Sequence, residues 1–111
     1  DMVESGGDIV NVLSMSSTIA LPGSAAYTAS KYGALGLTRA LSAEYRSRGI
    51  RISAVLPGAT GTSLWDYAGS NLDRSRMMTP QDVADAVMWA LERPASAHVD
   101  EIRIMPPDGV L

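Results

Sequence analysis

Short apolar stretches alternate along this chain with longer helix-like segments, and this alternation constrains the fold more than any other feature. Residues 8–14 and 50–58 are apolar runs bounded by glycine or proline, and residues 101–105 alternate polar and apolar side chains. Helices are predicted between these strands, over 25–48 and 80–93. Such alternation is typical of right-handed crossovers onto a parallel sheet, so the sequence predicts a doubly wound α/β fold.

Capping signals mark the ends of both predicted helices. Ser24 can cap the first helix, and Gly49 follows its last arginines as a stop signal. Residues 79–82 (TPQD) supply an N-cap hydroxyl, a proline at the first helical position and an acid in the first turn. The apolar stripe predicted for the second helix consists of Val83, Val87, Ala90 and Leu91.

Three strands and two long helices make only part of such a domain, because this architecture usually carries about six strands. No G-x-G-x-x-G turn follows any predicted strand, and the nearest candidate, residues 58–61, lacks the spacing. Residue 1 is Asp rather than an initiating Met. We therefore expect residues 1–111 to be the carboxyl-terminal portion of a single domain, with no second domain.

A long connection separates the second strand from the second helix. Residues 59–78 mix small and polar residues with four large apolar or aromatic ones, Trp65, Tyr67, Met77 and Met78. A connection of this length inside a compact domain is usually a lid or a binding loop. We expect a mobile substrate lid over about 62–78, in which Arg74 and Arg76 are solvated charges rather than an anion clamp.

The composition excludes several classes of function. The net charge is -3, and the scattered arginines form no basic stripe for nucleic acid. The longest apolar run, 86–91, is far shorter than the ~20 residues of a membrane span, and residues 1–7 do not resemble a signal peptide. We therefore expect a cytoplasmic protein. The chain has no cysteine and a single histidine, His98, so neither a thiolate nor a histidine-cluster metal site is expected.

A tyrosine and the only lysine lie four residues apart in the first predicted helix. Tyr27 and Lys31 therefore project from one face. A cation within about 4–6 Å of a tyrosine favours the phenolate, so the pair could act as a general acid/base. Ser14 ends the first predicted strand, at the edge where doubly wound sheets bind ligands, and could hold a carbonyl or alcohol oxygen. A solvated helix face is the alternative interpretation of the Tyr–Lys spacing.

Three motifs together resemble the classical short-chain dehydrogenase/reductase family. They are IVNVLS ending at Ser14, YTASK beginning at Tyr27, and PGATGT beginning at Pro57. Tyr-x-x-x-Lys alone is a common pattern, but the serine thirteen residues before it and the Pro-Gly twenty-six residues after the lysine make the combination specific. The resemblance covers nearly the whole chain. It implies a Rossmann domain, incomplete in this chain, that transfers a hydride between NAD or NADP and an alcohol or carbonyl substrate.

The resemblance also assigns roles to individual residues. Tyr27 is the proton donor or acceptor, Ser14 orients the substrate oxygen, and Lys31 supports the phenolate and binds the nicotinamide ribose. Ser16 is the second choice for the serine. Residues implied to contact the cofactor, besides Tyr27 and Lys31, are Val12, Pro57, Gly58, Thr60 and Thr62.

Several alternatives stand beside this assignment. The segment 79–107 looks like that of family members acting on small hydroxy acids and semialdehydes. The resemblance further implies a homodimer or homotetramer for the intact protein. A catalytically inactive fragment that acts only as an association module, through helix 25–49, is the alternative function. A serine hydrolase is excluded because Thr28 breaks the S-x-x-K spacing and no G-x-S-x-G elbow is present.

Overall fold

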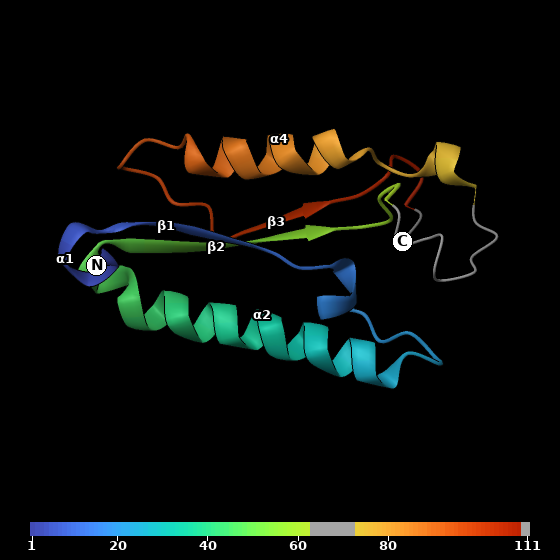
Figure 1. The fold of residues 1–111 in the computed structure, drawn as a ribbon, viewed down its shortest axis with the longest axis horizontal. Coiled ribbons are helices and arrows are strands. Elements are labelled where there is room, and N and C mark those ends of the chain that lie inside the picture. Colours follow the sequence, from blue (N-terminus) through green and yellow to red (C-terminus); the bar gives the residue numbers. More distant parts are fainter. Residues whose placement is uncertain (63–72, 110–111) are drawn as a thin grey trace.

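Two helices cover opposite faces of a three-stranded parallel sheet (Figure 1). The computed structural model describes residues 1–62 and 73–109. The strand order is β1 (Gly7–Val12), β2 (Ile50–Pro57) and β3 (Glu101–Ile104). Helix α2 (Ala25–Tyr45) lies on one face and α4 (Pro80–Leu91) on the other. The predicted doubly wound α/β arrangement is confirmed.

Short helical turns stand at the ends of the longer elements. They are α1 (Met2–Ser5) before β1, η1 (Met15–Ser17) after β1, η2 (Arg46–Arg48) before β2, and η3 (Arg74–Arg76) before α4. The described helices include none that is long and apolar enough to cross a membrane.

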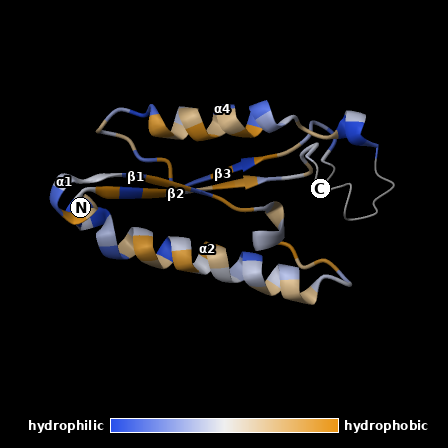
Figure 2. Ribbon diagram, in the orientation of Figure 1, coloured by the Kyte–Doolittle hydropathy of each residue, from blue (hydrophilic) through white to orange (hydrophobic). Residues whose placement is uncertain are grey.

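Strand β2 is the centre of the fold. It pairs with β1 from Gly7 opposite Ile50 to Val12 opposite Val55, and with β3 up to Pro57 opposite Ile104. Six of its eight residues are buried, which explains its nearly continuous apolar sequence (Figure 2). Its side chains join those of neighbouring elements in the main hydrophobic cluster, formed by Met15, Leu35, Ala54 and Leu56.

Each predicted strand and helix ends a few residues before its predicted boundary: β2 ends at Pro57, α4 at Leu91 and β3 at Ile104, and two differences have a clear local cause. The first strand ends at Val12 rather than at residue 14, because the chain turns into η1. The first α-helix ends at Tyr45, and residues 46–48 tighten into a 3-10 turn. Gly49 closes this turn with a φ of 75°, a left-handed conformation that glycine adopts without strain. The stop signal was therefore correct, although the last turn is not α-helical.

Helix α4 begins where its capping signal predicts. Thr79 Oγ1 accepts a hydrogen bond from the backbone N–H of Asp82, and the Asp82 carboxylate accepts one from the Thr79 N–H at 2.8 Å. Ala90 is buried and Val83 and Val87 are half-buried, as the predicted stripe requires. Leu91 is exposed, so its place in the stripe is wrong.

The two described ends of the long connection are joined to each other. Thr60 and Met78 form an isolated parallel bridge. The Met78 N–H donates to Ala59 O at 3.0 Å, and the Gly61 N–H donates to Met78 O at 2.8 Å. Met77 and Met78 are buried. Residues 63–72 of the predicted lid, which include Trp65 and Tyr67, lie outside the described part of the chain.

Charged pairs cross between elements on the sheet. Arg51 makes two hydrogen bonds with Asp8, at 2.6 and 3.0 Å, directly across the β1–β2 register. Arg39 of α2 makes two with Glu101 of β3, at 2.6 and 3.2 Å. The Arg51 hydrogen bond lowers the pKa of Asp8, and the Arg39 hydrogen bond lowers the pKa of Glu101. Both carboxylates are therefore stabilised in the ionised form.

Candidate active site

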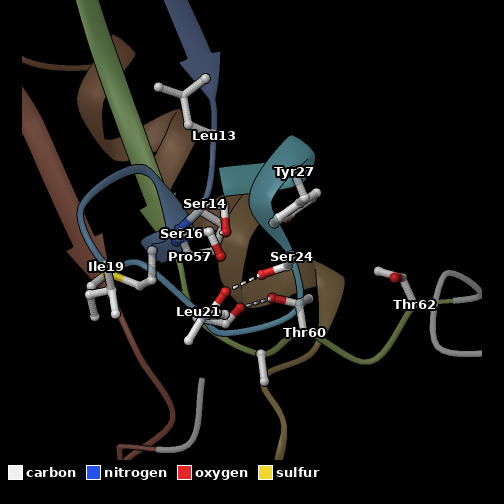
Figure 3. Close-up of a pocket in the computed structure, with 13 residues that line it drawn as sticks. Leu13, Ser14, Ser16, Ile19, Leu21, Ser24, Tyr27, Pro57, Thr60 and Thr62 are labelled. Atoms are coloured by element: carbon white, nitrogen blue, oxygen red, sulfur yellow. Dashed lines mark hydrogen bonds between the residues drawn. The ribbon is translucent and has the colours of Figure 1, made fainter. Parts of the chain in front are cut away.

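A cavity of about 500 Å³ opens at the carboxyl ends of β1 and β2. Its lining comes from three stretches of chain: residues 13–24 after β1, the first turn of α2, and residues 57–62 after β2 (Figure 3). Parallel strands bring their carboxyl ends to one edge of the sheet, where doubly wound proteins bind ligands. This volume falls within the range of small-molecule sites.

Ser14 lies two residues beyond β1 and is held in a defined orientation. Its backbone is extended, with φ −162° and ψ 156°, and it caps η1 by accepting a hydrogen bond from the Ser16 N–H at 3.0 Å. A hydroxyl that accepts one bond still carries its own hydrogen. Ser14 can therefore donate to an oxygen in the cavity, which it lines together with Ser16.

Tyr27 reaches the cavity from the first turn of α2. Its side chain is 43% exposed, and it lines the same cavity as Ser14. Ser24 occupies the N-cap position of this helix, but its hydroxyl donates to Leu21 O at 2.8 Å and makes no side-chain cap (dashed in Figure 3). The predicted capping bond is wrong. The Ser24 hydroxyl instead fixes the turn that leads into the helix.

Lys31 lies next to Tyr27 as their spacing predicts. Its Nζ atom is 5.5 Å from the centre of the Tyr27 ring. This places the positive charge beside the aromatic ring. Lys31 does not itself line the cavity, so its influence on a ligand there would pass through Tyr27 or through a group bound next to both.

The far wall of the cavity follows β2. Pro57, Gly58, Thr60 and Thr62 all line it, as the resemblance implied. The Gly58 N–H continues the β2–β3 ladder by donating to Ile104 O at 2.8 Å, and the Thr60 hydroxyl donates back to Gly58 O at 3.0 Å. Several hydroxyl groups and a carbon-rich wall face one space. That donor set fits a planar ring with one amide, such as nicotinamide.

One implied cofactor contact lies elsewhere. Val12 is 50% exposed at the end of β1 and is not among the lining residues. Strand β1 is the edge strand of the described sheet, so Val12 has a described neighbouring strand on one side only. The structure thus brings Ser14, Tyr27 and the residues after β2 to one cavity, adds Lys31 beside Tyr27, and leaves Val12 outside.

The sequence analysis missed the apolar part of the lining. These residues are Leu13, Met15, Ile19, Leu21 and Ala59. Ile19 and Leu21 stand out as aliphatic residues in an otherwise small and polar loop that leads directly to the helix of Tyr27. Their place in this loop, directly before the helix of Tyr27, was the signal that could have identified them as lining residues.

Comparisons with known proteins agree with this arrangement. Residues 1–73 match the family model described as short chain dehydrogenase. The A-factor type gamma-butyrolactone 1'-reductase (1S-forming) of Streptomyces virginiae is 35% identical over a match that covers 82% of this chain and 40% of that protein.

Two solved structures share the fold. A 4-hydroxyisoleucine dehydrogenase complexed with NADH and succinate has a TM-score of 0.75 at 29% identity, covering 95% of this chain and 48% of its own. An actinorhodin polyketide ketoreductase variant with NADPH has a TM-score of 0.79 at 27% identity, covering 97% of this chain and 49% of its own. The chain thus spans about half the length of the relatives that it matches.

Proposed function

The chain belongs to the short-chain dehydrogenase family, and on that premise we propose that it interconverts an alcohol and a carbonyl with Tyr27 as the proton donor and acceptor. The observation that carries this proposal is the shared cavity: Ser14 and Tyr27 line one space at the carboxyl edge of the sheet, and the Lys31 ammonium lies 5.5 Å from the Tyr27 ring. We propose further that residues 1–111 form the carboxyl-terminal portion of one dinucleotide-binding domain.

The protein residues would supply positioning and proton transfer. A bound nicotinamide, as NAD or NADP, supplies or accepts the hydride. In the reducing direction, the Tyr27 hydroxyl would give its proton to the carbonyl oxygen of the substrate. During oxidation, the Tyr27 phenolate takes the alcohol proton. Ser14 donates a hydrogen bond to the same oxygen, and the Lys31 ammonium stabilises the phenolate.

The cofactor would lie against the wall that follows β2. Pro57, Gly58, Thr60 and Thr62 line the same cavity as Ser14 and Tyr27, so a ring held against them would share one space with both hydroxyls. Lys31, one helical turn beyond Tyr27, would bind the ribose. The position of Val12 outside the lining does not support its predicted contact with the nicotinamide.

Assembly of the intact protein as a homodimer or homotetramer fits the outer face of α2. A Cβ atom added at Gly33 or Gly36 would meet no described atom within 4 Å. Tyr32 and Leu37 are exposed on the same helix. A helix with open glycines and exposed apolar side chains can approach a second copy closely. This face also supports the alternative function, an association module without activity.

Replacing Tyr27 by phenylalanine in the intact protein tests the catalytic proposal. The variant Tyr27→Phe keeps the ring beside Lys31 and removes the proton, so kcat should fall by about 10²–10⁴-fold while cofactor affinity changes little. Tyr32→Phe is the matched control, since Tyr32 lies on the same helix with the same 43% exposure but outside the cavity. Wild-type turnover in Tyr27→Phe would reject Tyr27 as the acid/base.

A further inference from the structure

The candidate active-site cavity is lined by carbon and hydroxyl groups and, among its described lining residues, by no charged side chain. In Figure 3, the Ser14 hydroxyl lies between Tyr27 and Ile19, and Leu21 lies below it. Leu13 and Ala59 add further apolar surface. The polar groups that face the space are the hydroxyls of serine, threonine and tyrosine.

The nearest candidate cations are engaged elsewhere. Arg76 directs Nε to the Asp108 carboxylate at 2.8 Å and Nη2 to the same oxygen, and neither Arg74 nor Arg76 is among the lining residues. Lys31 is not among the lining residues, and its Nζ atom lies 5.5 Å from the centre of the Tyr27 ring. Within the described part of the chain, the cavity therefore offers no guanidinium or ammonium to a substrate carboxylate.

An ionised group without a partner is unfavourable in such a space. Moving a carboxylate out of water is unfavourable unless an opposite charge meets it. Alkyl groups gain from the same surroundings with each CH₂ that is buried. The lining therefore favours the binding of neutral, apolar substrates over the binding of ionised ones.

We propose that the substrate is a neutral, mainly apolar ketone or secondary alcohol whose alkyl group packs against Leu13, Ile19 and Leu21. The proposal rests on the proposed function and names the substrate class for that site. It differs from the small hydroxy acids and semialdehydes that the segment 79–107 suggested. The reacting oxygen lies at Ser14 and Tyr27, and the alkyl group extends toward the loop before α2.

Binding to the intact protein in the presence of oxidised cofactor tests the proposal without turnover, because a ketone cannot be reduced in that complex. The probes are 3-oxobutanoate, its methyl ester and its hexyl ester, measured by titration calorimetry with saturating NAD or NADP, whichever the protein binds. The methyl ester should bind at least 10-fold more tightly than the acid, and the hexyl ester at least 10-fold more tightly than the methyl ester. An acid that binds as tightly as either ester overturns the proposal, as does the absence of binding by all three probes.

Turnover of the same probes with reduced cofactor keeps the two proposals separate. Correct binding order without any turnover would reject the proposed function and leave only the binding preference of the cavity for neutral, apolar ligands. Turnover that favours the acid over the methyl ester would reject the substrate class and leave the proposed function standing.

A cation introduced at the cavity mouth tests which residues set this preference. Leu21 is 37% exposed, so Leu21→Arg can be accommodated. This variant should reduce the ratio between the dissociation constants of the acid and the methyl ester at least 5-fold. Leu21→Gln, of similar size without charge, should leave that ratio within 2-fold. Ser96→Arg, exposed in the loop between α4 and β3 at the opposite edge of the sheet, should also leave it unchanged. An equal effect of Leu21→Arg and Ser96→Arg would remove Leu21 from the site.

Discussion

Gly58 is a position where one added methyl group should disturb both the fold and the cavity. An alanine Cβ would lie 2.8 Å from the Met105 Sδ atom, 3.1 Å from its Cε atom and 3.2 Å from the Pro106 Cδ atom. The Gly58 backbone cannot simply retreat, because its N–H bonds Ile104 O at 2.8 Å. The conflict must therefore be relieved by the residues that follow β3.

The expected cost follows from how far these neighbours must move. An ordinary contact begins at 3.4 Å, so the Met105 sulfur has to shift by about 0.6 Å. Methionine is flexible and adapts readily, whereas the Pro106 ring is fully buried. Overpacking of this kind costs about 1–3 kcal/mol, and the adaptability of Met105 favours about 1–2 kcal/mol. For a domain of 150–250 residues this corresponds to a fall in Tm of about 2–8 °C.

Thermal unfolding of three variants, compared with the wild type, measures this effect. Gly58→Ala should lower Tm, and Met105→Ala in the same chain should restore part of the loss, since it removes the closest atoms. Gly61→Ala is the matched control three residues later: its added Cβ meets only Met78 O, at 3.7 Å, so Tm should stay within about 2 °C. An unchanged Tm in Gly58→Ala, or an equal loss with and without Met105→Ala, would refute the packing argument.

Two further predictions concern acid stability and the chain by itself. The Arg51 hydrogen bond lowers the pKa of Asp8 below its usual 3.8, so the pair stabilises the fold above that pH and the stability is lost as the pH falls through the lowered pKa. Asp8→Asn should therefore flatten the fall in Tm below about pH 4, and a slope identical to wild type would contradict this. Residues 1–111 expressed alone should show no turnover, weak binding of NADH and NADPH by fluorescence titration, and self-association by light scattering, because the edge of β1 and the exposed Leu37 have no cover within the described structure. Saturable micromolar binding by a monomeric sample would contradict this prediction.

Local signals in the sequence predicted local structure well. Residues 79–82 specified the start of α4, and the continuous apolar run of β2 specified a strand covered on both faces. The Tyr27–Lys31 spacing predicted their proximity because a helix fixes the geometry of residues four apart.

The errors fell where a competing local hydrogen bond or a tertiary contact decides. Ser24 is a suitable N-cap by type, yet the turn at Leu21 competes for its hydroxyl. The side chains of Ile19 and Leu21 line the cavity because of the way their loop folds, and no hydrophobic periodicity in the sequence encodes that loop conformation. Val12 shares a strand with its neighbours, but its surroundings depend on what lies beside β1.

The bridge between Thr60 and Met78 holds together, beside the cavity, the two described ends of the connection between β2 and α4. The bonds that close it, from Met78 N–H to Ala59 O and from Gly61 N–H to Met78 O, involve backbone atoms alone. Substitution of side chains between these points does not remove them. Thr60 and Thr62 can therefore keep their places while residues 63–72 diverge or are exchanged with those of a relative.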